Sequence, residues 1–163
     1  MASADHLKIE SLDLTIDTLF KDFYSVPDFQ REFVWEREQV ERLLQDLYDE
    51  FYDEENRIIQ GPEYFLGSIV ACKAKDGTFQ LIDGQQRVTT LYLILCVIRD
   101  ILKEQSAKPS KVLDSQIVAA ATDPRTYEEV ERYRVALQYE DSDGVLAKIA
   151  SASFPVESIP ETT

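Results

Sequence analysis

The stretch LIDGQQRVTTLYLILCVIRDIL, from Leu81 to Leu102, decides how the rest of the chain is interpreted. It opens with the end of an apolar segment, continues through the polar run 83–87, and closes with a long apolar run. Gly84 allows the backbone to turn sharply, and the apolar run is long enough for a buried helix. The pattern predicts a strand that ends at Asp83, a tight loop, and a central buried helix over residues 85–105.

The residues at the start of this helix carry more polar chemistry than a helix start requires. Asp83 stands at the expected N-cap, and Gln86 completes a D-x-x-Q capping box. Arg87 is unusual, because a cation in the first turn faces the positive end of the helix dipole. A bound anion would offset that repulsion, and free N–H groups at a helix start bind phosphate-sized anions. Two interpretations stay open: a phosphate site, or a plain cap in which Arg87 pairs with a carboxylate such as Asp28 or Glu32.

Neutral polar side chains surround Arg87 in the sequence. Gln85 and Gln86 can form hydrogen bonds with a ribose, a base or an attacking water. Thr89 and Thr90 follow on the same helix and add two hydroxyl groups. These residues extend the candidate site beyond a single guanidinium.

A second polar segment, PDFQREFVW from Pro27 to Trp35, again joins an amide to a guanidinium, at Gln30 and Arg31. Aromatic rings beside an arginine can stack on a base or form a cation–π contact. Phe29 and Phe33 would supply such rings. The alternative is that the aromatic residues of this segment belong to the core and fix the start of the next helix. The two interpretations are compatible.

The remaining elements follow from periodicity and turn residues. Residues 36–52 predict an amphipathic helix with one apolar and one acidic face. Residues 64–83 predict an antiparallel hairpin with Asp76-Gly77 as its turn. Residues 115–123 fit a short strand or a short helix, and residues 126–151 predict one or two helical pieces divided near Gly144. The expected fold class is α/β (α+β), a small mixed sheet with helices.

The composition describes an acidic globular protein. The chain has 163 residues, is 44% hydrophobic and carries a net charge of -14. Such a charge disfavours non-specific nucleic-acid binding, because the phosphate backbone attracts clustered Lys and Arg, but a local basic pocket stays open. Cys72 and Cys96 lie in apolar runs, which predicts buried free thiols and a cytoplasmic location. His6 is the only histidine, so a zinc site, a Ser-His-Asp triad and an HNH nuclease centre are not expected.

Three segments, taken in order, resemble the N-terminal domain family of the GmrSD-type modification-dependent restriction enzymes. They are VPDFQREFVWEREQVERLLQDL, EYFLGSIV and LIDGQQRVTTLYLIL. The similarity is clear over residues 12–102 and extends through YRVALQYEDSDGVLAKIAS. The family has Tyr where this chain has Phe29, so a hydrogen bond from that hydroxyl is not expected here, while stacking is kept.

The resemblance implies a ParB/sulfiredoxin-like fold with a nucleotide site at the DGQQR loop. The implied cofactor is an NTP of undetermined identity, with Mg²⁺ as its candidate counter-ion and no metal ligand from the protein. The implied catalytic residues are Asp83, Gln86 and Arg87. The resemblance places the site at the loop 83–87, and the polar residues considered above complete the expected nucleotide-binding set: Gln30, Arg31, Gly84, Gln85, Arg87, Thr89 and Thr90.

The resemblance also implies a domain over residues 12–150, preceded by a flexible segment 1–11 and followed by a linker tail 151–163 from which a C-terminal nuclease domain is absent. The expected partners are a nucleoside triphosphate, a C-terminal nuclease domain or partner subunit, and modified DNA only in the full assembly. A homodimer is a further candidate, and no membrane partner is expected.

The expected function is a nucleotide-binding, NTP-hydrolysing regulatory or sensor domain of an anti-phage restriction system, without nuclease activity of its own. One alternative is a non-catalytic module that reads modified DNA, and another is a ParB-like nuclease domain. A third is a structural domain whose acidic face, including Asp46 and Asp49, blocks a nuclease partner.

Overall fold

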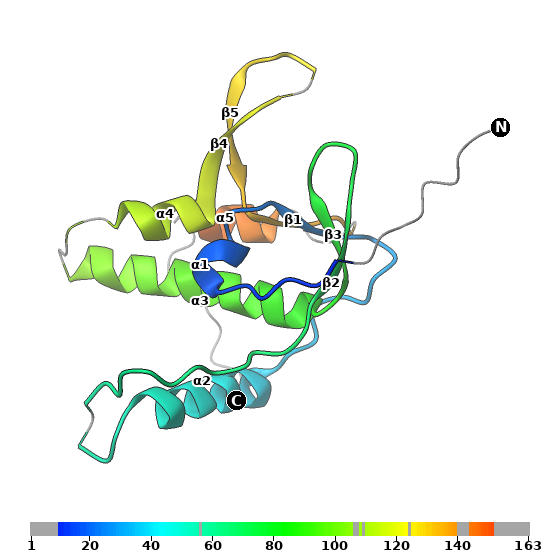
Figure 1. Cartoon of the computed structure of the whole chain (residues 1–163). Helices are drawn as coiled ribbons and strands as arrows, with labels where there is room; N and C mark the ends of the chain where they lie inside the picture. Colours follow the sequence, from blue (N-terminus) through cyan, green and yellow to red (C-terminus); the bar gives the residue numbers. More distant parts are fainter. Residues whose placement is uncertain are drawn as a thin grey trace.

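The computed structural model describes residues 10–55, 57–105, 108, 110–123, 125–139 and 144–151. The expected flexible segment 1–11 and the expected tail 151–163 fall almost wholly outside these residues. The helices and strands are shown in Figure 1. In chain order they are α1 Ile16–Leu19, β1 Tyr24–Val26, α2 Arg37–Phe51, β2 Val70–Lys73, β3 Phe79–Asp83, α3 Gln85–Glu104, α4 Lys111–Ile117, β4 Val118–Thr122, β5 Glu129–Tyr133, β6 Val135–Leu137 and α5 Val145–Ala150.

A four-stranded mixed sheet in the order β2-β3-β1-β6 organises the domain. β1 runs parallel to both of its neighbours, β3 and β6, whereas β2 pairs antiparallel with β3. The predicted α/β class is therefore confirmed. The predicted hairpin is confirmed as well, but its first strand begins at Val70 and not near Tyr64.

The inner face of α3 supplies much of the core. Val88, Leu91, Tyr92 and Cys96 join one buried cluster with side chains of β1, β3 and β6. The Tyr92 hydroxyl donates to the Ile117 carbonyl at 3.0 Å, which joins α3 to the end of α4. Each fully buried side chain of this size contributes about 1.5–3 kcal/mol through the hydrophobic effect. The helix predicted over residues 85–105 is thus confirmed as a core element.

The outer face of α3 is less buried than the sequence predicts. Val97, Ile98 and Ile101 are each more than two-fifths exposed, at 55%, 41% and 46%. On α2, whose bounds match the prediction closely, Leu43 is buried while Leu44 and Tyr48 are exposed. The two apolar patterns therefore predict the helices correctly. They predict more buried apolar side chains on each helix than the structure has.

The β4 and β5 strands form a separate two-stranded antiparallel sheet that projects from the body of the domain (Figure 1). The prediction of helical pieces over residues 126–151 is wrong for most of its described residues, since β5 and β6 lie there and α5 is the one helix among them. Pairing with distant strands overrides the helix propensity of Glu, Arg and Ala. Residues 115–123 contain both alternatives, the end of α4 and the whole of β4.

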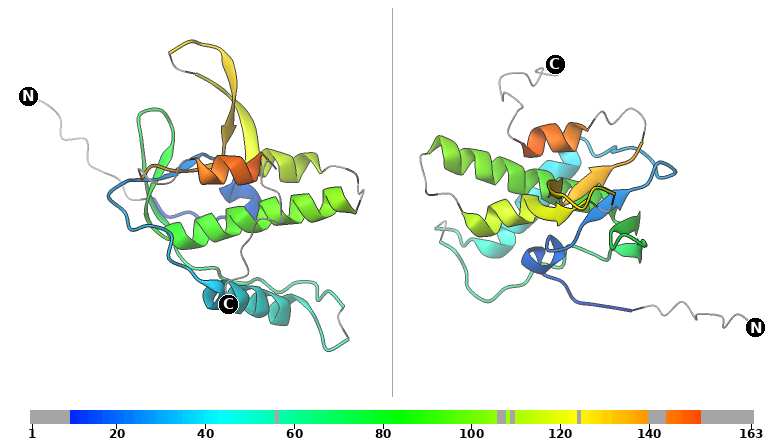
Figure 2. Two further views of the ribbon diagram at one scale, coloured as in Figure 1. Left: turned by 180° about the vertical axis from the view of Figure 1, so that it is seen from behind. Right: turned by 90° about the horizontal axis from the view of Figure 1, so that it is seen from above.

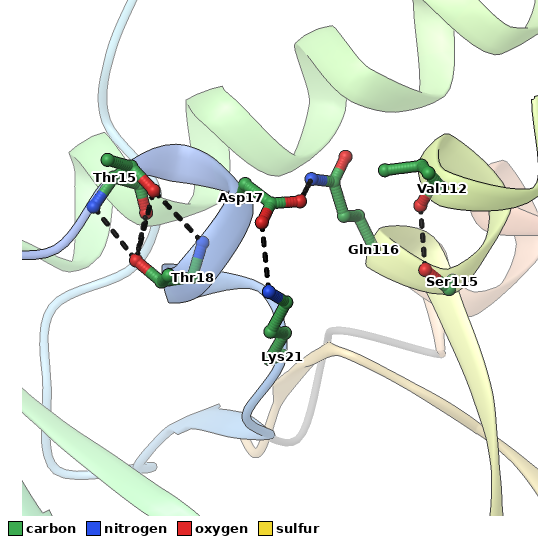
Figure 3. Close-up of polar contacts among 7 residues, drawn as sticks. All are labelled: Thr15, Asp17, Thr18, Lys21, Val112, Ser115 and Gln116. Carbon is green, nitrogen blue, oxygen red and sulfur yellow. Dashed lines mark hydrogen bonds and ion pairs between the residues drawn. The ribbon is translucent and has the colours of Figure 1, made fainter.

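Polar contacts fasten α1 to α4 (Figure 3). Thr15 and Thr18 form a capping box at the start of α1. Asp17 accepts a hydrogen bond from Lys21 Nζ at 2.9 Å and another from Gln116 Nε2 at 3.1 Å. Hydrogen bonding to Lys21 lowers the pKa of Asp17, so the carboxylate stays charged at neutral pH. The hydrogen bond between Gln116 and Asp17 joins α1 to α4, and the other contacts stabilise α1 itself.

The two cysteines differ in environment. Cys96 is buried as predicted, and burial raises the pKa of its thiol to about 11. Cys72 is exposed, contrary to the prediction, because β2 is the edge strand of the sheet. Among the helices of the described residues, none has the length and hydropathy that crossing a membrane requires.

Candidate functional site

The strands β3, β1 and β6 run in parallel, and α3 begins directly after β3 at their shared carboxyl edge. In open α/β sheets, ligands bind beyond the carboxyl ends of the strands. Val26 at the end of β1 and Leu137 at the end of β6 line a small hollow there, together with Gln85 and Gln86 of α3, and this hollow has no room for a water-sized molecule. The helix start singled out in the sequence therefore lies where this kind of sheet places a ligand.

The helix begins without the predicted capping box. Asp83 is exposed and is the last residue of β3, with its backbone in register with Val70. Gly84 is the N-cap instead, with φ at 82° and no side-chain cap hydrogen bond. A Cβ at Gly84 would lie 3.1 Å from Ile69 Cγ1, so the tight turn needs glycine. The N-cap residue consequently supplies no side-chain bond to the N–H groups of the first turn.

The amide of Gln86 holds the PDFQREFVW segment, called here the 27–35 loop, against α3. Its Oε1 accepts from the backbone N–H of Val34 at 2.8 Å and of Trp35 at 3.3 Å. Its Nε2 donates to the Glu32 carbonyl at 2.9 Å. Gln86 is only 7% exposed, so these bonds form away from water. Main-chain contacts with the 27–35 loop thus explain why Gln86, a polar residue, stands in the first turn of an apolar helix.

Gln85 fastens the same loop one residue earlier. Its Nε2 donates to the Arg31 carbonyl at 3.0 Å, while its buried Oε1 has no hydrogen-bond partner among the described residues. Gln30 adds a weaker contact, from Nε2 to the Ile82 carbonyl at 3.4 Å. A buried acceptor without a partner is unfavourable by about 1–3 kcal/mol.

Arg87 lies on the other flank of the helix start. Its Nη1 donates to the Ser68 carbonyl at 2.7 Å. Gly67, at φ 104°, makes room for this contact, because a Cβ there would come within 2.8 Å of Nη1. Within the described part of the chain, Arg87 forms no ion pair with a carboxylate, neither with Asp28 nor with Glu32. The interpretation of Arg87 as an ion-pair partner is therefore not supported.

The aromatic and basic groups of the 27–35 loop divide between core and surface. Arg31 is exposed, and it lines the hollow with the half-buried Phe33. Trp35 is half-buried as well, in keeping with a packing role. Phe29 is 71% exposed and leaves its ring face free for stacking. Arg31 and Arg87 thus stand at the same helix start on different segments.

The two threonines occupy different surroundings. Thr89 is 3% exposed and lines the hollow. Thr90 is also buried, does not line the hollow, and has a hydroxyl without a hydrogen-bond partner among the described residues.

Several contributors to this site were missed in the sequence. Gly67 and Ser68 position Arg87, and Tyr139 lines the hollow. A glycine inside a predicted strand is a signal of close backbone approach, so Gly67 could have been found. No sequence pattern around Tyr139 predicts its position, because only the fold of the chain places it beside α3. No cluster of three or more His, Cys, Asp or Glu in the described residues could hold a metal ion.

Comparison with known proteins identifies the family of the chain. A family model of the N-terminal domain of the GmrSD restriction endonuclease matches residues 15–162, which include the 27–35 loop, β3 and α3. A comparison with curated proteins gives no match. The matched range covers most of the chain. The chain therefore belongs to the family of GmrSD restriction endonuclease N-terminal domains and is a domain of a restriction system.

Proposed function

We propose that this domain binds a nucleoside triphosphate at the start of α3 and thereby regulates the restriction system to which it belongs. One observation carries the proposal: α3 begins without a side-chain cap, beside a guanidinium that has no carboxylate partner among the described residues. Free backbone N–H groups and a forked cation together favour a phosphate group. The family of the chain supports the restriction context.

The phosphates would accept hydrogen bonds from the N–H groups of Gln85, Gln86 and Arg87, which are the first three residues of α3. Arg87 would contribute its guanidinium from one flank and Arg31 from the other. The exposed ring of Phe29 is available to stack on the base. Mg²⁺ would arrive with the triphosphate, since the protein offers no carboxylate cluster for it in the described residues.

Hydrolysis would require two further roles. Arg87 would stabilise the charge that develops on the transferred phosphoryl group, and the exposed Asp83 would orient water or Mg²⁺. Thr89 would add a hydroxyl from the wall of the hollow. Gln86 would act indirectly, because its amide is already bonded to the main chain of the 27–35 loop.

The binding proposal can be tested with a matched pair of glycine variants and one arginine variant. Gly67 and Gly61 have the same φ of 104°, but a Cβ at Gly67 would meet Arg87, whereas a Cβ at Gly61 would meet nothing within 4 Å. Gly67→Ala is expected to displace the guanidinium and weaken triphosphate binding. Gly61→Ala introduces the same backbone strain and is expected to leave binding unchanged. Arg87→Ala is expected to weaken binding about tenfold to a hundredfold, through loss of a charge-assisted contact.

Isothermal titration of the four common ribonucleoside triphosphates with Mg²⁺ is the appropriate measurement, and circular dichroism confirms that each variant is folded. Equal affinity of the parent and Arg87→Ala for every triphosphate would mean that the guanidinium serves only the Ser68 carbonyl. Equal losses in Gly67→Ala and Gly61→Ala would assign the effect to backbone strain.

A binding module without hydrolysis is the second candidate function. It is favoured by the position of Gln86, whose amide is committed to Glu32, Val34 and Trp35 and so is not free to orient water. Phosphate release by the purified chain, measured with and without DNA, separates the two candidates. Binding without release supports the module, and release that Arg87→Ala abolishes supports the NTPase.

A further inference from the structure

A second cavity lies away from the start of α3. It is a cleft of about 320 Å³ between the β2–β3 turn, β5, β6 and the beginning of α5. The β2–β3 and β4–β5 hairpins rise from the same side of the molecule, as the views from the front and from behind show (Figures 1 and 2). Among the described residues, the cleft shares Leu137 alone with the hollow at α3, so the two cavities are distinct.

Ser25 places a buried hydroxyl group at this cleft. Successive side chains of a strand point to opposite faces of the sheet. Tyr24 and Val26 belong to the core cluster, so Ser25 between them faces the other side of the sheet. It lines the cleft, is 3% exposed, and its Oγ has no hydrogen-bond partner among the described residues. A buried hydroxyl without a partner is unfavourable, and a ligand in the cleft would supply one.

The neighbours of Ser25 leave room and add hydrogen-bonding groups. Gln80 of β3 and Ala136 of β6 are its register partners on either side, and both line the cleft. The small Ala136 side chain keeps the cleft open. The Gln80 amide forms no hydrogen bond with a described residue, so a donor and an acceptor stand beside the Ser25 hydroxyl. Gln138 adds a second amide at the rim.

The charges at the cleft disfavour an anionic ligand. Arg132 is already engaged, since it donates to Thr78 Oγ1, lies 3.6 Å from Asp76 Oδ2 and stacks 4.5 Å over the Phe23 ring. Hydrogen bonding by Thr78 lowers the pKa of Asp76, which therefore stays ionised at neutral pH. Glu131 adds a second carboxylate to the lining. Two carboxylates against one guanidinium leave a small negative charge that repels phosphate.

We infer that this cleft binds one uncharged ring molecule between a hexose and a nucleoside in size, which accepts and donates hydrogen bonds with Ser25 and Gln80. The volume lies at the lower end of the range, about 300–1,000 Å³, in which proteins bind small molecules. Tyr133 also lines the cleft and can offer its ring as an apolar contact. Nucleosides and hexoses are both uncharged ring molecules with hydrogen-bond donors and acceptors, and the test below distinguishes between them.

The whole chain, labelled with ¹⁵N, is titrated with uridine and separately with glucose, and amide shifts are followed by NMR. One of the two is expected to shift the amides of β1, the middle of β3 and β6. The amides of residues 85–87 should stay unchanged, which keeps this site separate from the proposed triphosphate site. Shifts from uridine alone assign a nucleoside, and shifts from glucose alone assign a hexose.

Variants decide whether the shifts arise from the inferred contacts. Ser25→Ala removes an unpartnered hydroxyl, so the thermal midpoint should be maintained while the dissociation constant rises about tenfold. Gln80→Ala should weaken binding to a similar degree. Ser115→Ala, which removes an exposed hydroxyl bonded to the Val112 carbonyl, is the control and should bind like the parent. The inference is overturned if neither compound shifts these amides at millimolar concentration, or if Ser25→Ala and Gln80→Ala both bind like the parent.

Discussion

Gln86 uses both ends of its amide to hold a loop that lies about fifty residues earlier in the chain, at a sequence separation of 52 from Val34. Both the Oε1 and the Nε2 contacts are made by a side chain that is almost completely buried. Truncation would leave main-chain groups of the 27–35 loop without partners. A buried main-chain group without a partner lowers stability more than the loss of an average hydrogen bond does.

Gln86→Ala is therefore expected to lower the free energy of unfolding by about 1–3 kcal/mol. Gln45 on α2 offers a control, since its Nε2 donates to Asp49 Oδ1 at 2.6 Å on an exposed surface. Gln45→Ala should change stability by only about 0.2–0.5 kcal/mol. Urea denaturation followed by circular dichroism measures both. Equal losses in the two variants would show that burial of the Gln86 amide contributes nothing.

Single residues could be selected from the sequence where the relevant physics is local, and the roles proposed for them in binding stay predictions. Gly84 and Arg87 stand out in the sequence because glycine permits an unusual φ and a cation opposes the helix dipole. The capping box failed because the backbone of Asp83 continues the β3 ladder, which leaves the N-cap to Gly84. The bonds of Gln86 could not be anticipated, because their acceptors and donors lie in a separate segment.

Among the elements, α3 has two faces of very different burial. Leu91 is 3% exposed within the core, whereas Ile98 on the outer side is 41% exposed. Leu91→Ala should therefore lower the free energy of unfolding by about 2–5 kcal/mol, through lost transfer energy and a new cavity. Ile98→Ala should lower it by about 1 kcal/mol or less, because the removed atoms are partly hydrated and Ala favours the helix.

Thermal or urea unfolding of the two variants checks this difference in a single series. A loss at Ile98→Ala as large as that at Leu91→Ala would indicate that the outer face of α3 is covered in solution. A loss below about 1 kcal/mol at Leu91→Ala would contradict its place in the core.

Elements with a strong local pattern were predicted, and elements that depend on distant pairing were not. The amphipathic period predicted α2, and the long apolar run predicted α3. The Asp76-Gly77 pair predicted the turn of the β2–β3 hairpin. β5 was misread as helix because its sequence EVERY is rich in helix formers, and pairing with β4 decides its structure. β6 is three residues long and is defined only by its register with β1.

For the whole molecule, the net charge of -14 sets the limits of DNA binding. Phosphate backbones are bound through clustered cations, and this chain has 17 Lys and Arg against 31 Asp and Glu. The isolated chain is expected to give no shift of an unmodified DNA duplex at physiological salt in a gel-retardation assay. It is also expected not to cut that duplex in the presence of Mg²⁺.

Nicking that depends on Mg²⁺ and is lost on Asp83→Ala or Arg87→Ala would place a nuclease centre at α3 and contradict this expectation. Tight binding at physiological salt would require a cationic surface that the overall charge conceals. A salt series distinguishes that case, because such binding weakens steeply as salt rises.

The most direct test of phosphate binding at the start of α3 is an NMR titration of the ¹⁵N-labelled chain with nucleoside triphosphates and Mg²⁺. The N–H groups of Gln85, Gln86 and Arg87 form the uncapped first turn, so their amide signals should shift most and should saturate. The amide of Arg31 should follow with a smaller shift, and the amides of β4 and β5 should not move. The proposal is contradicted if all four triphosphates leave the amides of residues 85–87 unshifted at millimolar concentration, or if the shifts are confined to another part of the molecule.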